Sequence, residues 1–254
     1  DLGRLLVAGI TAISAAYQLA AIVACVVYRR SAQSRSGELP SISVLKPLKG
    51  ADASLRDAIR SHLALPGSFE LLCGYRADDS LAASVVQEFP RVRAVVCSTV
   101  TTNAKVGSLV DLVAAAKYDL LIQNDADICV PPDYFEKVAG PLVQDSGVAF
   151  VTCLYRPVGS TLAAKFEGLG TVTDFAPSAL VGRMIGVDDL AVGATMAFRR
   201  ADLDRIGGFR PIGDFLADDF QLGLRLRGLG KRGEISQAIV ETELGGGWGD
   251  VWRH

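Results

Sequence analysis

Residues 117–132 read KYDLLIQNDADICVPP and bring two carboxylates directly after a short apolar run. The run at residues 120–122 is typical of a buried strand. Asp125 and Asp127 follow it, one residue apart. Open α/β sheets bind ligands at the carboxyl ends of their strands, and carboxylates there can hold a hard cation such as Mg²⁺ or Mn²⁺. The stretch therefore predicts a cation site that grips a diphosphate through the metal.

The D-x-D spacing is weak evidence for such a site when taken alone. The chain contains 20 Asp, so about one or two matches arise by chance at this composition. A second match, Asp202 and Asp204, follows two arginines, and we interpret it as the solvated start of a helix. Asp125 and Asp127 by themselves also fit an Asx-type turn that caps a strand. The surrounding sequence has to distinguish these alternatives.

Composition excludes several classes of function. The chain has 254 residues, of which 50% are hydrophobic and 21% charged, and a formal net charge of −2. This supports one sizeable core and is too little basic charge for a nucleic-acid partner. Because His62 and His254 are the only histidines, a His-based zinc site and a Ser-His-Asp triad are disfavoured. Acid–base chemistry is left to carboxylates.

The five cysteines are scattered and show no C-x-x-C spacing. Cys73, Cys97 and Cys153 lie inside apolar, strand-like runs. We therefore interpret them as small buried hydrophobic residues in a protein that works in a reducing compartment.

The N-terminal region is long and apolar enough for a membrane helix. Residues 5–28 hold no charged side chain and run for about 24 residues, which is sufficient to cross a bilayer. Residues 29–35 hold three arginines, against one before the run, so the positive-inside rule puts the downstream chain in the cytoplasm. We predict a transmembrane helix at residues 1–30 and a polar linker at 31–40. The alternative is a buried core helix.

The remaining region, residues 41–254, alternates between strand-like and helix-like patterns. Runs rich in Val, Leu and Ile predict strands at 41–45, 69–75, 92–97, 118–123 and 148–155. The stretches between them predict helices at 53–63, 81–89, 105–116 and 133–143. This order predicts an α/β fold with a doubly wound, mostly parallel sheet. The Gly-rich phosphate-binding sequences are absent, so a bound nucleotide would depend on carboxylates and a metal.

Four more charged residues fall at the ends of predicted strands or the starts of predicted helices. Lys46 ends the first strand, and Lys105 opens the third helix. Asp78 and Asp79 follow the second strand. Cations along one sheet edge suit a negatively charged diphosphate. The alternatives are ordinary surface lysines and, for the two aspartates, a helix N-cap.

Beyond Tyr155 the alternation loosens. Residues 192–198, which include Gly193, form a strand-like run that opens with small residues. Asp218 and Asp219 precede a further predicted helix. They fit a catalytic role or a helix N-terminus, where the macrodipole favours carboxylates.

The ordered set of motifs resembles the processive-type family 2 glycosyltransferases. It is most similar to the ceramide glucosyltransferase family and its hopanoid-biosynthesis-associated bacterial relatives. The matching residues are Ser43-Val44-Leu45-Lys46-Pro47-Leu48-Lys49-Gly50, Asp78-Asp79, Asn103-Ala104-Lys105, Lys117-Tyr118-Asp119-Leu120, Asp125 and Asp218-Asp219. A membrane helix, a short linker and this order of motifs is also the family's layout. The resemblance covers the chain from residue 5 to its end.

This resemblance implies the GT-A fold, in which an acceptor half is appended to a nucleotide-binding α/β sheet. It implies that Asp78 and Asp79 contact the uridine and that Lys46 and Lys105 lie near the nucleotide. Gly193 would lie near the donor sugar, where the lack of a side chain lets a hexose approach.

The same resemblance assigns the metal and the catalytic base. Asp125, with Asp127, would hold Mn²⁺ or Mg²⁺ on the diphosphate of a UDP-sugar. Asp218 would belong to the donor site, and Asp219 would be the general base. The family's fifth motif, (Q/R)-x-x-R-W, is missing where the chain stops at residues 251–254, so we expect a C-terminally truncated catalytic domain.

The function implied is an inverting transfer of glucose or N-acetylglucosamine to a lipid hydroxyl such as that of ceramide or a hopanoid. We expect the inner membrane as the location, a cytoplasmic catalytic domain, and a hydrophobic acceptor groove from residues 155–190. One alternative is a transferase that makes a polysaccharide or uses polyprenyl phosphate, and another is a non-catalytic, membrane-bound nucleotide-sugar sensor. Phosphoryl transfer on an aspartyl nucleophile also uses D-x-D, but it expects Thr or Val where this chain has Cys129.

Overall fold

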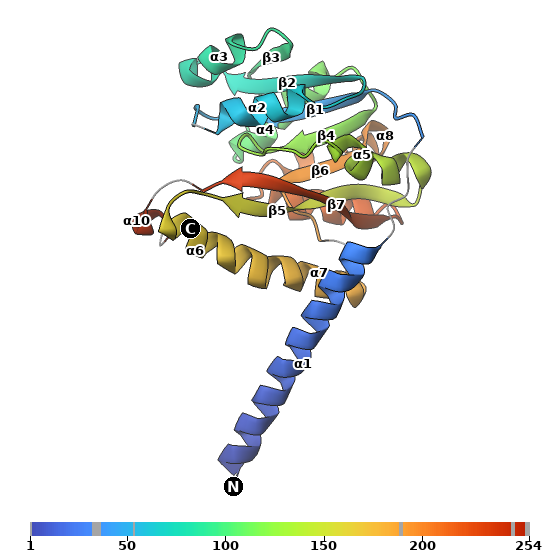
Figure 1. Cartoon of the computed structure of the whole chain (residues 1–254). Helices are drawn as coiled ribbons and strands as arrows, with labels where there is room; N and C mark the ends of the chain where they lie inside the picture. Colours follow the sequence, from blue (N-terminus) through green and yellow to red (C-terminus); the bar gives the residue numbers. More distant parts are fainter. Residues whose placement is uncertain (1, 32–36, 53, 188–189, 245–246, 252–254) are drawn as a thin grey trace.

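The computed structural model describes residues 2–31, 37–52, 54–187, 190–244 and 247–251. Within them, a seven-stranded sheet has the order β3-β2-β1-β4-β6-β5-β7. Its strands are β1 (Ile42–Pro47), β2 (Phe69–Arg76), β3 (Val92–Cys97), β4 (Leu120–Asn124), β5 (Val148–Val158), β6 (Thr195–Arg199) and β7 (Arg232–Glu243). The helices that accompany it are α2 (Leu55–Leu63), α3 (Ser80–Gln87), α4 (Ala104–Ala115), α5 (Tyr134–Gln144), α8 (Arg200–Arg205) and α9 (Asp218–Arg227). Figure 1 shows them on the two faces of the sheet.

The sheet is mostly parallel, as predicted. β1 pairs in parallel with β2 and β4, β2 with β3, and β5 with β7. β6 runs antiparallel between β4 and β5. The carboxyl ends of β1, β2 and β4 therefore meet at one edge, which is where ligands bind in open α/β sheets.

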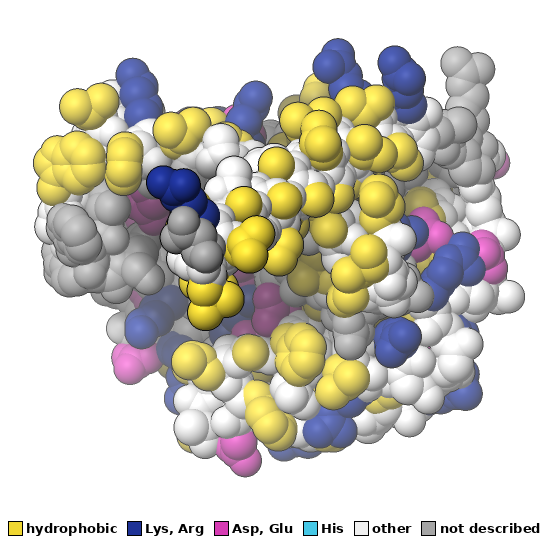
Figure 2. Space-filling model, turned by 90° about the horizontal axis from the view of Figure 1, so that it is seen from below, with side chains coloured by type: hydrophobic (Ala, Val, Ile, Leu, Met, Phe, Trp, Pro, Cys, Tyr) yellow, Lys and Arg dark blue, Asp and Glu magenta, His cyan; other side chains and the backbone are white. Residues whose placement is uncertain are grey.

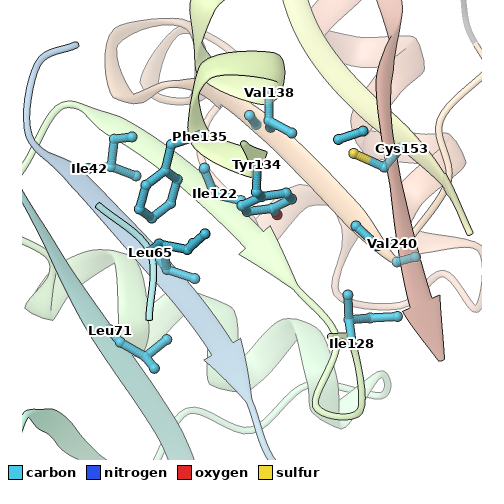
Figure 3. Close-up of a cluster of buried hydrophobic side chains, with 14 of the residues drawn as sticks. Ile42, Leu65, Leu71, Ile122, Ile128, Tyr134, Phe135, Val138, Cys153 and Val240 are labelled. Atoms are coloured by element: carbon cyan, nitrogen blue, oxygen red, sulfur yellow. The ribbon is translucent and has the colours of Figure 1, made fainter. Parts of the chain in front are cut away.

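Neighbouring residues on each strand enter different cores because successive side chains point to opposite faces. Val44 and Ile122 join the cluster packed against α2, α3 and α5, whereas Leu45 and Leu121 join the cluster on the α4 side. Figure 3 shows the first cluster, in which Tyr134 of α5 packs near Ile122. Both faces of these strands are buried, which explains their continuous apolar sequences.

The predicted strands and helices of residues 41–155 are confirmed, with ends shifted by a few residues. The three cysteines predicted to be buried, Cys73, Cys97 and Cys153, are indeed buried. Part of the predicted linker, residues 32–36, and the C-terminal residues 252–254 lie outside the described residues.

Two expectations about the second half need correction. The sequence pattern predicts no strand at residues 232–243, yet β7 pairs with β5 along its length. Asp202 lies in the first turn of α8, at the start of a helix as predicted, but is buried rather than solvated. The carboxylate of Asp202 lies 2.6 Å from Nζ of Lys231, the residue directly before β7, and 3.1 Å from the guanidinium of Arg199. Asp202 is therefore a buried ion-pair partner of Lys231 and Arg199 rather than a solvated residue.

Two helical segments lie apart from the sheet's main layers. α1 (Leu2–Arg30) projects away from the sheet, and among the described residues it is the one helix long and apolar enough to cross a membrane. α6 (Leu162–Gly170), a π-helical turn (Thr171–Phe175) and α7 (Ala176–Met184) form a continuous helical segment, here called the transverse rod. Figure 1 shows the rod running beneath β5 and β7 and meeting α1 at its α7 end.

Candidate active site

The loop after β4 is held in place from behind by Lys46. The side chain of Lys46 is fully buried, and its Nζ donates hydrogen bonds to Asn124 Oδ1 at 2.6 Å and to the carbonyl oxygen of Asp125 at 2.5 Å. A third contact reaches the carbonyl oxygen of Ala126 at 3.3 Å. Burial lowers the pKa of Lys46 to about 8. The side chain thus contacts the D-x-D backbone, and its predicted place near the nucleotide stays a prediction.

Asn124 joins this loop to the neighbouring strand. Its side chain is buried and donates to the carbonyl oxygen of Ala194 at 3.2 Å and to Thr195 Oγ1 at 2.9 Å. Ala194 and Thr195 lie at the start of β6, so the antiparallel strand brings Gly193 close to the D-x-D loop. Asn124 was not among the predicted site residues. Its position between the apolar run and Asp125 is the signal that would have identified it.

Lys105 connects two carboxylates that are far apart in the sequence. Its Nζ lies 2.7 Å from Asp125 Oδ1 and 3.5 Å from Asp218 Oδ2. Burial disfavours the charged form of Lys105, but Asp125 and Asp218 outweigh it and raise its pKa. Burial raises the pKa of Asp125, and nearby Asp127 adds to this effect against the opposing pull of Lys105. Two carboxylates thus share one ammonium in a partly buried cluster.

Asn103 places both Lys105 and Asp218. Its side-chain oxygen accepts a hydrogen bond from the backbone N–H of Lys105 at 3.1 Å and caps α4. Its side-chain nitrogen donates to Asp218 Oδ1 at 3.2 Å and to the carbonyl oxygen of Phe215 at 3.0 Å. The sequence Asn103-Ala104-Lys105 therefore ties the start of α4 to the loop before α9.

Asp127 contacts the strand that the sequence analysis missed. Its Oδ2 accepts a hydrogen bond from Thr242 Oγ1 near the end of β7. The same loop pairs with β7 through Cys129 and Glu241, whose backbone N–H groups each donate to the other's carbonyl oxygen at 2.8 and 2.9 Å. Thr242 is a site residue without a sequence signal of its own, because its strand was not predicted.

Asp219 is the second residue of α9 and lies next to Gly193. A Cβ added to Gly193 would lie 3.1 Å from Asp219 Oδ2, which is tighter than an ordinary contact. Asp219 is partly exposed, and its Oδ1 accepts the backbone N–H of Phe220 at 2.8 Å. Oδ2 of Asp219 therefore faces the space that is open because Gly193 has no side chain.

A cavity of about 470 Å³ unites these groups. Gly193, just before β6, also lines it. The polar residues of the lining are Lys105, Asp125, Asp127, Asp218, Asp219 and Thr242. Its apolar wall includes Tyr155, Phe175, Leu190 and Leu216. A second cavity of about 610 Å³ lies between α1, α5, α7 and β7, and the described residues that line it include none of the predicted site residues.

Asp78 and Asp79 lie at the end of β2, outside the described lining of the 470 Å³ cavity. Asp79 is the N-cap of α3 and accepts the backbone N–H of Ala82 at 3.0 Å. Its other oxygen accepts the N–H of Gly50 at 2.6 Å. Asp78 is exposed. The N-cap interpretation therefore holds for Asp79, while a uridine contact by either residue stays a prediction.

The carboxylates fit a metal that arrives together with a nucleotide. Among the described residues, no group of three or more His, Cys, Asp or Glu side chains is placed to hold a metal ion. Asp125 and Asp127 nevertheless line one cavity. Mg²⁺ in nucleotide sites is usually held by one or two carboxylates and takes its other oxygens from phosphate and water. Two carboxylates are therefore a sufficient protein donor set for a metal–diphosphate.

Two curated ceramide glucosyltransferases are similar to this chain in sequence. Ceramide glucosyltransferase 1 of Caenorhabditis elegans is 29% identical over 207 residues, which are 78% of this chain and 44% of that protein. Ceramide glucosyltransferase 3 of the same organism is 27% identical over 207 residues, 78% of this chain and 45% of that protein. The chain thus spans less than half the length of these two relatives.

Two solved structures show the same architecture. The mannosyltransferase PcManGT of Pyrobaculum calidifontis, in complex with GDP-Man and Mn²⁺, superposes with a TM-score of 0.66 at 17% identity, over 96% of this chain and 70% of its own. TarS residues 1–349 of S. aureus, in complex with UDP, gives a TM-score of 0.56 at 10% identity, over 81% of this chain and 61% of its own. These similarities confirm the GT-A-like fold. The family model described as glycosyl transferase family 21 matches residues 6–253, and the chain belongs to this family.

Proposed function

We propose that this glycosyltransferase is a membrane-bound, inverting enzyme that moves a hexose from a UDP-sugar to the hydroxyl of a lipid such as ceramide or a hopanoid. The observation that carries the proposal is the 470 Å³ cavity, in which an acidic and basic wall faces an apolar one. The polar wall suits a metal–diphosphate and a sugar. The apolar wall suits the lipid body of an acceptor.

On the donor side, Asp125 and Asp127 would hold Mn²⁺ or Mg²⁺ on the diphosphate. When bound, the metal would neutralise charge that develops on the leaving diphosphate and orient it. Lys105, 2.7 Å from Asp125, would provide a second positive charge beside the phosphates. Asp218 holds Lys105 from the other side at 3.5 Å, so its donor-site role would be to position that lysine.

Asp219 is the proposed general base. Its carboxylate would accept the proton of the acceptor hydroxyl while the hydroxyl oxygen forms a bond to the anomeric carbon. The bond between that carbon and the diphosphate oxygen breaks, and UDP leaves with the electron pair. Gly193 supports this role because a side chain there would crowd Asp219 Oδ2 at 3.1 Å. The sugar can approach the base only where this space stays open.

The lipid acceptor and the membrane location share one structural argument. α1 has the length and hydropathy of a membrane span, and Phe175 of the rod lines the cavity beside Tyr155, with ring centroids 5.4 Å apart. A span next to an apolar cavity wall favours an acceptor that resides in the bilayer. Arg29 and Arg30 in the last turn of α1 favour a cytoplasmic catalytic domain, and we propose the inner membrane as its location.

The test is acceptor-dependent release of UDP by the full-length protein in membranes. UDP-glucose and UDP-N-acetylglucosamine would be paired with ceramide and hopanoid acceptors, with Mn²⁺, with Mg²⁺ and after chelation. Asp219→Asn is expected to lower turnover by about 10²–10⁴-fold, the usual contribution of a general base, while UDP binding persists. Asp214→Asn is the matched control. Asp214 is an exposed carboxylate in the loop before α9, and it accepts a hydrogen bond from the hydroxyl of Thr102.

Each result of this test has a clear meaning. Normal turnover by Asp219→Asn would remove Asp219 as the base. Turnover that survives chelation would remove the metal assignment. UDP binding without turnover by the wild type on any pair would favour the sensor or the polysaccharide alternative.

A further inference from the structure

The α6 part of the transverse rod exposes a row of large apolar side chains, which is unusual for a helix that faces water. Leu162, Phe166 and Leu169 follow one another at spacings of four and three, so they share one side of the helix. They are 73%, 61% and 55% exposed. The buried side of α6 instead carries the small residues Ala163 and Ala164. Surface helices of soluble proteins normally place polar side chains outward.

The exposed apolar surface continues along the rod and beyond it. Val172 of the π-helical turn is 43% exposed, Met184 at the end of α7 is 49% exposed, and Ile185 is 74% exposed. Trp248 lies against Phe166 with ring centroids 5.6 Å apart. Figure 2, which views this underside, shows hydrophobic side chains gathered across it. Contiguous apolar surface of this kind marks a protein or membrane contact.

The contact between the rod and α1 identifies what covers this surface. Tyr17 bonds Ser178 of α7 through their hydroxyl groups at 2.6 Å, and Ala24 packs with Ala179 and Leu180. α7 therefore lies beside the part of α1 that runs from Tyr17 toward its C-terminal end.

The length of α1 then places α7 within the bilayer. From residue 5 to Tyr17 a helix rises by about 18 Å, whereas the hydrocarbon core is about 30 Å thick. If α1 spans the membrane, the bilayer must extend past Tyr17, along the stretch that contacts α7. α7 is consequently at the depth of the lipids, and the rod runs across α1 rather than along it (Figure 1).

We propose that the transverse rod is an interfacial membrane helix that seats the catalytic domain in the leaflet, with its apolar stripe Leu162, Phe166 and Leu169 among the acyl chains. Amphipathic helices lie in this way at the boundary of headgroups and chains. The inference rests on the proposed membrane-bound function, because it takes α1 as a span. It adds that a lipid acceptor reaches the cavity past Phe175, the rod residue that lines it.

The test uses single-tryptophan variants of the full chain in phosphatidylcholine vesicles. Trp248→Phe and Trp252→Phe remove the two tryptophans of residues 1–254, any tryptophan outside these residues is replaced likewise, and Phe166→Trp then reports on the rod. Ile13→Trp reports on α1, where Ile13 is 73% exposed, and Leu81→Trp on α3, where Leu81 is 63% exposed. Quenching by lipids brominated on their acyl chains is compared with quenching by aqueous acrylamide.

Strong bromolipid quenching of both Phe166→Trp and Ile13→Trp, with Leu81→Trp quenched by acrylamide alone, is the expected result. If Ile13→Trp is quenched by lipid and Phe166→Trp behaves like Leu81→Trp, the interfacial helix is overturned while the membrane span stands. If Phe166→Trp is shielded from both quenchers, a second copy or another protein covers the rod and the proposal is wrong. If the lipid quencher also leaves Ile13→Trp unquenched, α1 does not span the membrane, and the proposed membrane-bound function is wrong as well.

A second experiment tests whether insertion of the transverse rod into the membrane is needed for turnover. Leu169→Glu should lower UDP release with a lipid acceptor and leave UDP binding unchanged, because the charge opposes burial in the acyl region. Leu81→Glu, at a comparably exposed apolar position on α3, should leave both unchanged. Equal turnover of the two variants would contradict the proposed seating.

Discussion

The β1–β4 half of the sheet and the β5–β7 half use their polar side chains differently. In the first half, Lys46 and Asp79 are satisfied by the protein's own loops and helix ends: Lys46 holds the carbonyl oxygen of Asp125 at 2.5 Å, and Asp79 binds the N–H groups of Gly50 and Ala82. In the second half, Asp218, Asp219 and Thr242 line the cavity together with Gly193.

This difference shows that one set of sequence motifs contains two kinds of residue. In the first half, Lys46 and Asp79 hold the loops at the ends of β1, β2 and β4, while Asp125 and Asp127 line the cavity. Those around β6, β7 and α9 surround the space in which a sugar and an acceptor would meet. Substitutions of Lys46 and Asp79 should therefore cost stability, and substitutions of the residues that line the cavity, such as Gly193, should cost turnover.

The largest expected effect on stability is at His62, which is fully buried on α2. Burial lowers its pKa to about 3, well below the usual 6.5. As the pH falls from 6.5 towards 3, the unfolded chain binds a proton that the folded chain excludes, so stability is lost across this window. The loss is on the order of 4 kcal/mol by pH 3. His62→Leu should flatten this part of the pH dependence of thermal unfolding, and an unchanged acid sensitivity would contradict the assignment.

Lys46→Met should destabilise the first half by about 1–3 kcal/mol, because the acceptors on Asn124, Asp125 and Ala126 lose a buried donor. The melting temperature in detergent measures this change. Lys49→Met is the control, since Lys49 is an exposed lysine two residues beyond β1. Equal melting temperatures for the two variants would show that Lys46 does not hold the loop.

Gly193→Ala should lower turnover in the second half by about tenfold, equivalent to about 1.4 kcal/mol, with little change in melting temperature. The added Cβ would lie 3.1 Å from Asp219 Oδ2 and displace the proposed base. Gly170→Ala is matched to it, because a Cβ at Gly170 meets nothing within 4 Å. A variant at Gly193 that melts early but turns over normally would reverse the proposed division between the halves.

The smallest effect separates the two neighbouring aspartates. Asp79→Ala should cost about 1 kcal/mol through loss of the α3 N-cap, whereas Asp78→Ala should leave the melting temperature unchanged because Asp78 is exposed. UDP affinity, measured on both variants by calorimetry, then tests the predicted uridine contact. Weaker UDP binding by Asp78→Ala alone would assign the contact to Asp78, and unchanged binding by both would remove it.

Sequence by itself determined the β1–β4 half. Apolar runs revealed the buried strands, and the residues just after them, Asp79 and Asp125 among them, were found because ligand-binding residues follow strand ends in such sheets. It also identified α1 as a membrane-helix candidate from its length and lack of charge. These features can be predicted because each depends only on the order of residues within one short segment of the chain.

Only the tertiary structure decided which of those residues meet. It placed Lys105 between Asp125 and Asp218, Thr242 on Asp127, and Gly193 against Asp219. The contact of Gly193 depends on the antiparallel insertion of β6, and that of Thr242 depends on the charged edge strand β7. Neither strand has a local signature that names its partner strand. Periodicity reports which side of an element is buried. The partner is chosen by how distant elements pack together, and that choice assembled the site.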